Sequence, residues 1–247
     1  MLETSENYRI HPDPRISANQ LAEYALASPS RRQAILRNAK YAPVFLVVRY
    51  NNARSSVCDY LTDGTRPVAT LHKAEADLKA SAGSLGSRFK ENDALLSAEA
   101  IASFASFTSN KTQYPKAFSK LTFAHVTGQM PKLPMSGVEV SVQIDLVSKN
   151  VAKETCGGVL LQTSKAISAK SWREEHSLYA ASLIWMASSE FLKGYGSVDP
   201  NLCYAVDLFG KKATKAPKSY KTRVKNLEAA CGEIAAMWGT IEPPSDL

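Results

Sequence analysis

The sequence predicts an α/β (α+β) protein in which a helical region precedes a mixed α/β domain. Residues 1–82 carry mostly helical patterns. Residues 138–147 alternate apolar and polar side chains, as a half-buried strand does. Residues 171–193 place apolar side chains at spacings of three, four and seven, which are typical of a helix. Hydrophobic residues make up 45% of the chain and charged residues 21%, so the chain can bury a core.

The first two predicted helices begin at residues that cap helices. Ser17 and Gln20 have the spacing of a capping box, which predicts a helix over residues 18–27. A Ser-Pro pair begins residues 28–40, and proline favours the first helical position, so a second helix is expected there. The chain before Ser17 is expected to be an irregular arm.

Two further helix candidates complete the N-terminal region. Residues 43–64 have approximately helical spacing, although the β-branched run VFLVV leaves a short strand as an alternative. Residues 67–80 form the other candidate. The stretch SAGSLGSR is rich in small residues and is expected to be a linker or surface loop. It separates an N-terminal helical region, 1–82, from a core domain, 88–247.

The core domain is expected to contain seven elements in the order helix, strand, strand, strand, helix, strand, helix. Their ranges are 91–107, 117–126, 138–147, 158–164, 171–193, 201–209 and 220–238. In the second strand, apolar side chains such as Val142 and Ile144 should be buried, and Asp145 should lie on the more polar side. The third strand is more apolar, as expected for the middle of a sheet. The four strands should form a mixed sheet with helix 171–193 packed on it.

The chain carries a net charge of +7, and part of the excess lies in one stretch without acids. This basic run, KKATKAPKSYKTRVK, contains Lys211, Lys212, Lys215, Lys218, Lys221, Arg223 and Lys225. Arg31 and Arg32 begin a second concentration. Such clusters attract the phosphates of nucleic acid without reading base sequence. The alternative is a solvated basic surface.

Several function classes are excluded or disfavoured by what the sequence lacks. It has no run of roughly 18 apolar residues and no apolar stretch near its N-terminus, so a cytoplasmic protein without a membrane partner is expected. The four cysteines are far apart and form no C-x-x-C pair, which favours reduced thiols over a zinc site. No Walker loop, G-x-G-x-x-G or G-x-S-x-G pattern occurs.

The order of elements over about residues 91–210 resembles the core of the PD-(D/E)XK, or restriction-endonuclease-like, superfamily. The resemblance implies an αβββαβ core in which the second strand supplies an aspartate. The third strand supplies an acid and a lysine one residue apart. Two carboxylates on adjacent strands would hold Mg²⁺ or Mn²⁺ against the scissile phosphate, and the lysine would orient or deprotonate water.

Asp145 lies near the end of the second predicted strand, where the resemblance implies the metal-binding aspartate. Two registers are open for the third strand. If Lys165 is the lysine, Thr163 stands at the position of the acid. If Gln162 replaces the lysine, Leu160 stands there instead. Neither register contains a carboxylate.

The resemblance allows the missing acid to come from the first core helix, which carries Glu91 and Glu99. The candidate catalytic residues are therefore Asp145, Gln162, Lys165, Glu99 and Glu91, with Asp145 as the metal ligand and Mg²⁺ as the cofactor if the protein is active.

Three hypotheses follow from these residues. In the first, the protein binds nucleic acid through a nuclease-like fold, is weakly active or inactive, and acts as a subunit of a larger assembly. In the second, it is an active Mg²⁺-dependent nuclease of DNA or RNA. In the third, it is a protein-interaction module that does not bind nucleic acid. The superfamily would imply a role in bacterial defence or in mobile elements.

Overall fold

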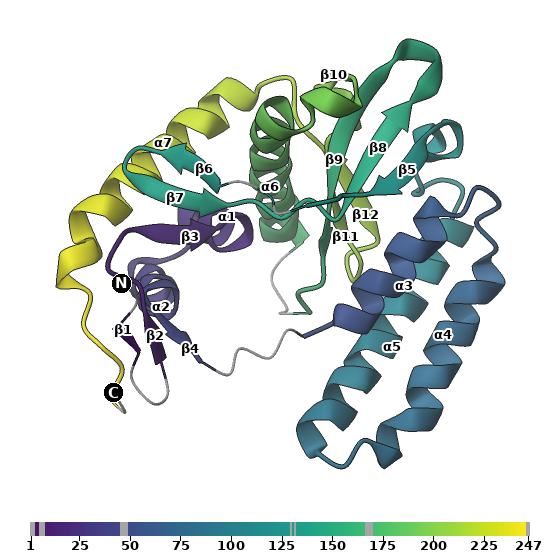
Figure 1. Cartoon of the computed structure of the whole chain (residues 1–247), viewed down its shortest axis with the longest axis horizontal. Coiled ribbons are helices and arrows are strands. Elements are labelled where there is room, and N and C mark those ends of the chain that lie inside the picture. Colours follow the sequence, from purple (N-terminus) through teal and green to yellow (C-terminus); the bar gives the residue numbers. More distant parts are fainter. Residues whose placement is uncertain are drawn as a thin grey trace.

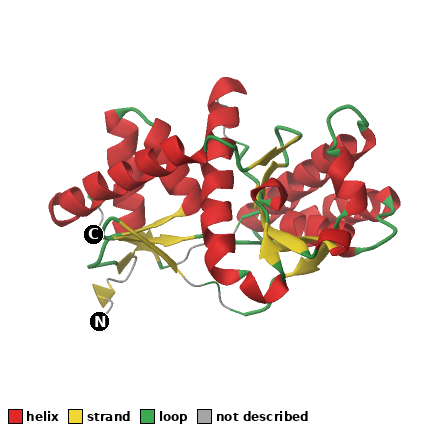
Figure 2. Ribbon diagram, turned by 90° about the horizontal axis from the view of Figure 1, so that it is seen from above, coloured by secondary structure: helices red, strands yellow, loops and turns green. Residues whose placement is uncertain are grey.

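The computed structural model describes residues 3–4, 8–44, 49–128, 130, 132–165 and 170–245. Its centre is a mixed sheet of six described strands (Figure 1). Five of them follow one another across the sheet in chain order: β5 (Thr122–His125), β8 (Leu146–Asn150), β9 (Thr155–Gln162), β11 (Tyr204–Asp207) and β12 (Lys212–Lys215). The sixth, β10 (Ser197–Val198), pairs with the start of β9. Helices flank the strands on both sides (Figure 2), which confirms the predicted α/β class.

The strand directions bring two carboxyl ends to one edge of the sheet. β8 runs antiparallel to β5 and β9, β11 runs parallel to β9, and β12 returns antiparallel to β11. A parallel pair needs a long crossover, which α6 (Lys170–Phe191) supplies between β9 and β11. α6 therefore begins near the edge where β9 and β11 end.

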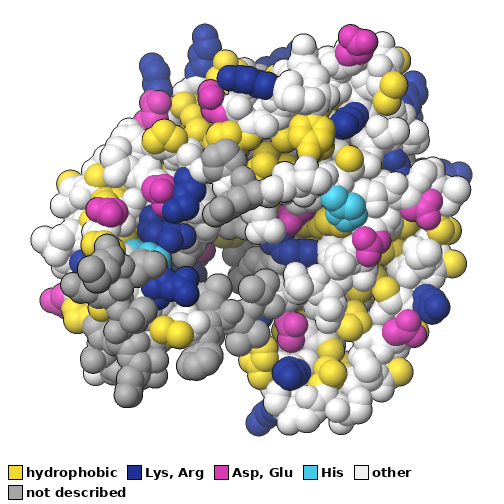
Figure 3. Space-filling view, viewed as in Figure 1, with side chains coloured by type: hydrophobic (Ala, Val, Ile, Leu, Met, Phe, Trp, Pro, Cys, Tyr) yellow, Lys and Arg dark blue, Asp and Glu magenta, His cyan; other side chains and the backbone are white. Residues whose placement is uncertain are grey.

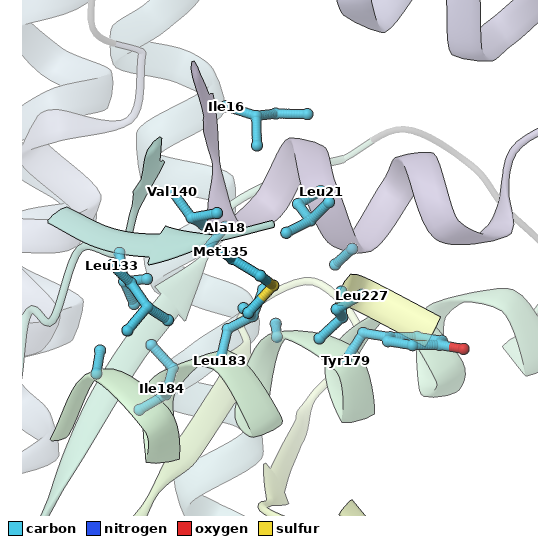
Figure 4. Close-up of a cluster of buried hydrophobic side chains, with 14 of the residues drawn as sticks. Ile16, Ala18, Leu21, Leu133, Met135, Val140, Tyr179, Leu183, Ile184 and Leu227 are labelled. Carbon is cyan, nitrogen blue, oxygen red and sulfur yellow. The ribbon is translucent and has the colours of Figure 1, made fainter. Parts of the chain in front are cut away.

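One face of the sheet packs against α6, together with α1 (Ala18–Leu26) and α7 (Tyr220–Met237). Val147, Leu160 and Ala205 belong to this cluster of buried side chains. Figure 4 shows Leu183 of α6 near Leu227 of α7 in the same cluster. α2 (Pro29–Lys40) also contributes to it. Burial of this apolar surface, at about 25 cal/mol per Å², is the main term that holds these helices to the sheet.

The opposite face packs against α3 (Asn51–Thr62) and α5 (Arg88–Ser109). Leu146, Leu161 and Val206 point to this side, one residue out of phase with the side chains of the other cluster. α4 (Val68–Ser81) packs on α5, and only Leu71 of its described side chains is fully buried. The first 82 residues therefore contribute to both faces of the sheet: α1 and α2 to one, α3 and α4 to the other.

Two smaller sheets lie beside this core. The first joins β1 (Glu3–Thr4), β2 (Tyr8–Ile10) and β4 (Tyr41–Pro43), and the second joins β3 (Arg15–Ser17), β7 (Val138–Ser141) and β6 (Lys132–Met135). β3 pairs in parallel with β7, so the segment directly before α1 is attached to the core domain.

The prediction of a single strand over residues 138–147 is wrong. β7 ends at Ser141 and β8 begins at Leu146, and the two strands belong to different sheets. Val142 and Ile144 are buried as expected and continue the apolar side of β7. Leu146, however, points to the opposite face of the main sheet. The alternation thus continues through a segment where the chain changes its pairing partners, because alternation encodes burial and not the identity of the neighbouring strand.

Most of the predicted helices are confirmed, and most of the errors concern strands. The Ser17 hydroxyl accepts a hydrogen bond from the Gln20 amide, which confirms the capping box. The ranges predicted as strands at 117–126 and 201–209 begin instead with short 3₁₀ helices, η2 (Lys116–Lys120) and η5 (Pro200–Leu202). β12 was not predicted, because its residues were interpreted by charge alone. The alternative strand VFLVV lies almost wholly outside the described residues.

None of the helices within the described ranges is long and apolar enough for a membrane span.

Candidate functional site

Two of the predicted site residues, Asp145 and Gln162, lie near the carboxyl end of β9, which is next to that of β11. A cavity of about 380 Å³ opens there, between α1, the chain before α3 and the start of α6. Gln162 and Asp207, the last residues of the two parallel strands, both line it. Ligands of open α/β sheets bind at such carboxyl edges, so this is the region in which a site is expected.

Asp145 directly precedes β8, and its carboxylate is fully engaged by hydrogen-bond donors. Arg54 Nη1 lies 2.9 Å from Oδ1 and 3.0 Å from Oδ2. The Leu161 amide donates to Oδ2 at 2.6 Å, and Gln143 Nε2 donates to Oδ1 at 3.0 Å. The Asp145 side chain is only 5% exposed. The predicted polar surroundings of Asp145 are therefore present, but they are buried and already satisfied.

The electrostatics of Asp145 follow from this enclosure. Burial raises the pKa of its carboxyl group, whereas the Arg54 guanidinium and the hydrogen bonds from Leu161 and Gln143 act in the opposite direction. Arg54 is itself only 18% exposed, so water screens the pair weakly. The guanidinium contacts both carboxylate oxygens, which are the atoms through which Asp145 would bind a metal ion.

The arrangement does not fit the Mg²⁺ site that the resemblance implies. Such a site needs several oxygen ligands, and both oxygens of Asp145 already accept hydrogen bonds. Within the described ranges, no group of three or more His, Cys, Asp or Glu side chains is placed to hold a metal ion. In this conformation the Asp145 carboxylate holds the Arg54 guanidinium.

Gln162 is buried in a hydrogen-bonded network that joins three elements. Ser177 Oγ donates to its Oε1 at 2.8 Å, and its Nε2 lies 3.0 Å from His176 Nδ1. His176 Nε2 lies 3.1 Å from the Asn19 carbonyl oxygen, which can only accept, so Nε2 carries the proton and Nδ1 accepts from Gln162. Burial lowers the pKa of His176, consistent with this neutral form. Gln162 thus links β9 to α6 and α1, and both ends of its amide are occupied.

Lys165 and Glu99 do meet, but on the surface. Lys165 Nζ lies 2.6 Å from Glu99 Oε2, and both side chains are about half exposed. The acid–lysine pair is therefore formed between α5 and the chain after β9, and not within one strand. Glu91 lies in the first turn of α5, where it is exposed. Neither glutamate is bonded to Asp145 in the described structure.

A second buried ion pair was missed by the sequence interpretation. Arg173 Nε donates to Asp207 Oδ2 at 2.8 Å, its Nη2 donates to Oδ1 at 2.5 Å, and the Gly210 amide donates to Oδ1 at 2.8 Å. A Cβ at Gly210 would collide with the Asp207 carboxylate and would have to displace it from its present position. The sequence does contain one indication of this pair: Asp207 lies near the end of a predicted strand, where an acid can face the start of a helix.

Arg54 gave no signal at all, since it lies 91 positions from Asp145 on a helix assigned to the other region.

The basic run is divided between two ends of the sheet. Lys212 is paired with Asp207 across the β11–β12 ladder, close to the cavity, whereas Lys215 is paired with Tyr204 at the other end. Three of its cations have partners: Lys211 donates to Ser106 Oγ at 3.1 Å, Lys212 to Glu174 at 2.8 Å, and Arg223 to Glu175 at 2.8 Å.

The other four cations of the run are exposed and form no ion pair in the described part of the chain: Lys215, Lys218, Lys221 and Lys225. Figure 3 shows several Lys and Arg side chains at the upper left of the molecule, where α7 lies. Arg31 and Arg32, the second predicted group, pair with Glu23 at 2.7 Å and Glu233 at 3.3 Å. Within the run, the lysines without a described partner therefore begin at Lys215, after the paired Lys211 and Lys212.

Comparison of the chain with known protein families, with curated proteins and with solved structures found no match.

Proposed function

We propose that this protein binds nucleic acid through a restriction-endonuclease-like core whose metal site has been replaced by an ion pair, and that it does not depend on cleavage for its role. The proposal has three parts: the core, the loss of the metal site and the binding surface. Each is supported by a separate observation.

The order of the central elements supports the core. α5, β5, β8, β9, α6 and β11 follow one another as the resemblance implies, and the five main strands keep their chain order across the sheet. The β6–β7 hairpin is inserted between β5 and β8 and pairs with β3. This insertion explains why Asp145 follows a strand of one sheet and precedes a strand of another.

The observation that carries the proposal is the contact of Arg54 with both oxygens of Asp145. A metal ion held by Asp145 would have to displace a guanidinium and would still lack a second carboxylate, because Leu160 on β9 and Thr163 directly after it stand at the two candidate positions. A divalent ion with one protein ligand keeps most of its water and is poorly positioned on a phosphate. We therefore expect little or no cleavage.

The free lysines support binding of nucleic acid. Lys215, Lys218, Lys221 and Lys225 lie near one another in the sequence, are exposed, and have no acidic partner among the described residues. Lys221 and Lys225 are four positions apart on α7 and so share a helix face. Each lysine that neutralises a phosphate releases condensed counterions, which makes binding strongly dependent on salt.

The test is fluorescence anisotropy with labelled single- and double-stranded oligonucleotides over a series of salt concentrations. The proposal predicts binding whose logarithmic affinity falls linearly with the logarithm of salt concentration. No binding at low salt to any oligonucleotide would contradict it and would favour a protein-interaction module.

A further inference from the structure

The cavity at the carboxyl ends of β9 and β11 has an excess of positive charge. Among the described residues, its lining contains Arg31, Arg49 and Arg173 but only two acids. Both acids are already paired, Glu23 with Arg31 and Asp207 with Arg173. Arg49 is exposed, and its guanidinium lies 5.4 Å from the centre of the Phe89 ring without a described acidic partner. An anionic group that enters the cavity would therefore find one uncompensated guanidinium.

The cavity also contains an aromatic ring in a fixed orientation. Trp172 stacks on His176, with ring centres 4.9 Å apart and an angle of 18° between the planes. His176 is held by Asn19 and Gln162, so the indole rests on a ring that is itself fixed by hydrogen bonds. Tyr50 lines the same cavity and packs edge-on against Phe209. Rings fixed in this way bind a flat ligand without a further cost in side-chain entropy.

Several polar groups in the lining have no described partner. Trp172 Nε1, Tyr50 Oη and Thr163 Oγ1 are all donors, and no hydrogen bond of the described residues uses them. A volume of about 380 Å³ lies in the range of small-molecule sites, about 300–1,000 Å³. The cavity is thus small, rich in donors, aromatic and positively charged.

We infer that this cavity binds one unpaired nucleotide, with the base against Trp172 and the phosphate on Arg49. The inference rests on the proposed function, because it assigns a separate contact for an unpaired strand beyond the lysines that hold the phosphate backbone. A flat base with an attached phosphate matches the ring, the donors and the unpaired guanidinium together, whereas a base inside a duplex is already stacked between its neighbours. The same chemistry is found in the end of a single strand and in a free nucleotide.

The experiment uses the full chain, with AMP in isothermal calorimetry and, in anisotropy, an adenine single strand and a blunt duplex. Two variants address the cavity: Arg49→Gln removes the cation, and Trp172→Leu removes the ring but keeps apolar volume. Each should lower the affinity for the single strand by about tenfold, which corresponds to about 1.4 kcal/mol, since each variant removes one charge-assisted hydrogen bond or one base stack. Trp172→Phe should keep most of the affinity, and all three variants should leave duplex binding unchanged.

Binding of AMP that Arg49→Gln weakens would identify the free nucleotide as a ligand. If the single strand binds but AMP does not, and the variants weaken binding of the strand, the ligand is the end of a strand. Both outcomes support the inference. Equal affinities of wild type, Arg49→Gln and Trp172→Leu for the single strand and for AMP would overturn it, while the proposed function would stand if the lysine variants still weaken binding. If AMP binds and no oligonucleotide does, the result would support a nucleotide site in the cavity and contradict the proposed function.

Discussion

Arg54 and Asp145 form a buried ion pair that fastens α3 to the residue before β8. The two residues are 91 positions apart, and the guanidinium contacts both carboxylate oxygens at 2.9 and 3.0 Å. The Leu161 amide completes the contact from β9. The pair therefore ties together α3, β8 and β9 at the place where the resemblance implies a metal ligand, and these contacts satisfy the buried Asp145 carboxylate.

Removal of one partner of this pair should be costly. Arg54→Met leaves an uncompensated carboxylate in a buried position, so we expect the free energy of unfolding to fall by about 3–5 kcal/mol in urea denaturation. The exposed pair Lys132–Glu139 is the matched control, and Glu139→Gln should change stability by less than about 1 kcal/mol. A loss of equal size in both variants would show that the Arg54–Asp145 contact has no special structural role.

The close contact of β9 with the segment before β11 predicts a second stability effect. A Cβ at Gly157 would collide with the backbone of Leu202, and backbone cannot move aside as a flexible side chain can. Gly157→Ala should therefore destabilise the fold by about 1–3 kcal/mol or more. Gly83→Ala, where the space around the new Cβ is empty, is the control. Thermal unfolding at equal temperatures for the two variants would contradict the described packing of β9.

His176 should make stability depend on pH. Burial lowers its pKa below the ordinary value of 6.5; Asn19, Glu23 and Asp207 oppose the shift, and Arg173 adds to it. Above about pH 6.5 His176 is neutral in both the folded and the unfolded state, so its burial costs no protonation free energy there. Its contribution is lost as the pH falls towards the folded pKa, because the unfolded state then binds more protons.

The measurement is the free energy of unfolding at pH 7.5 and 5.5 for wild type and for His176→Gln, which can keep the donor to Asn19 but cannot titrate. The variant should lose less stability over this interval than the wild type. His11, whose pKa burial also lowers, is present in both proteins and cancels in the comparison. His125→Gln alters an exposed histidine and should behave like the wild type. Equal losses in wild type and His176→Gln would contradict a neutral His176.

The free lysines of the basic run should carry the salt-dependent part of nucleic-acid binding. We expect Lys215→Glu, Lys218→Glu and Lys221→Glu together to lower affinity for a duplex by at least about tenfold at low salt. The slope of log affinity against log salt concentration should fall by about 3 in magnitude, about 1 for each lost phosphate contact. The control carries the same change in charge at exposed positions on or near the α3–α5 side: Lys73→Glu, Lys111→Glu and Lys116→Glu. Equal losses in the two triple variants would mean that net charge, and not this surface, governs binding.

Local patterns predicted the helices well because capping and helical spacing act within a few residues. The Ser17–Gln20 capping box and the extent of α6 were both evident in the sequence. The passage of the chain from one sheet to another between β7 and β8 was not evident, because buried side chains alternate in the same way whichever strand is the neighbour. β12 was not predicted because its lysines suggested an exposed basic segment, although Ala213 is partly buried and Thr214 is buried.

The site was predicted only where its residues lie on the core strands. Asp145 and Gln162 do lie near the carboxyl end of β9, but their partners Arg54 and His176 come from other elements, α3 and α6. No local pattern encodes such a pairing, because it depends on how α3 and α6 pack on opposite faces of the sheet. The division of the basic run into paired and free lysines likewise depends on α5 and α6, which supply Ser106, Glu174 and Glu175.

The central claim, binding without cleavage, is tested most directly by the length of a labelled oligonucleotide that the protein has bound. Single- and double-stranded substrates are incubated with saturating protein and Mg²⁺ or Mn²⁺, and the labelled strands are then separated under denaturing conditions. We predict that the strands are bound and keep their full length. Shortened products that require the metal and that disappear in Asp145→Ala would contradict the claim, and would mean that Arg54 leaves Asp145 when substrate binds and that another acid, such as Glu99 or Glu91, completes a metal site.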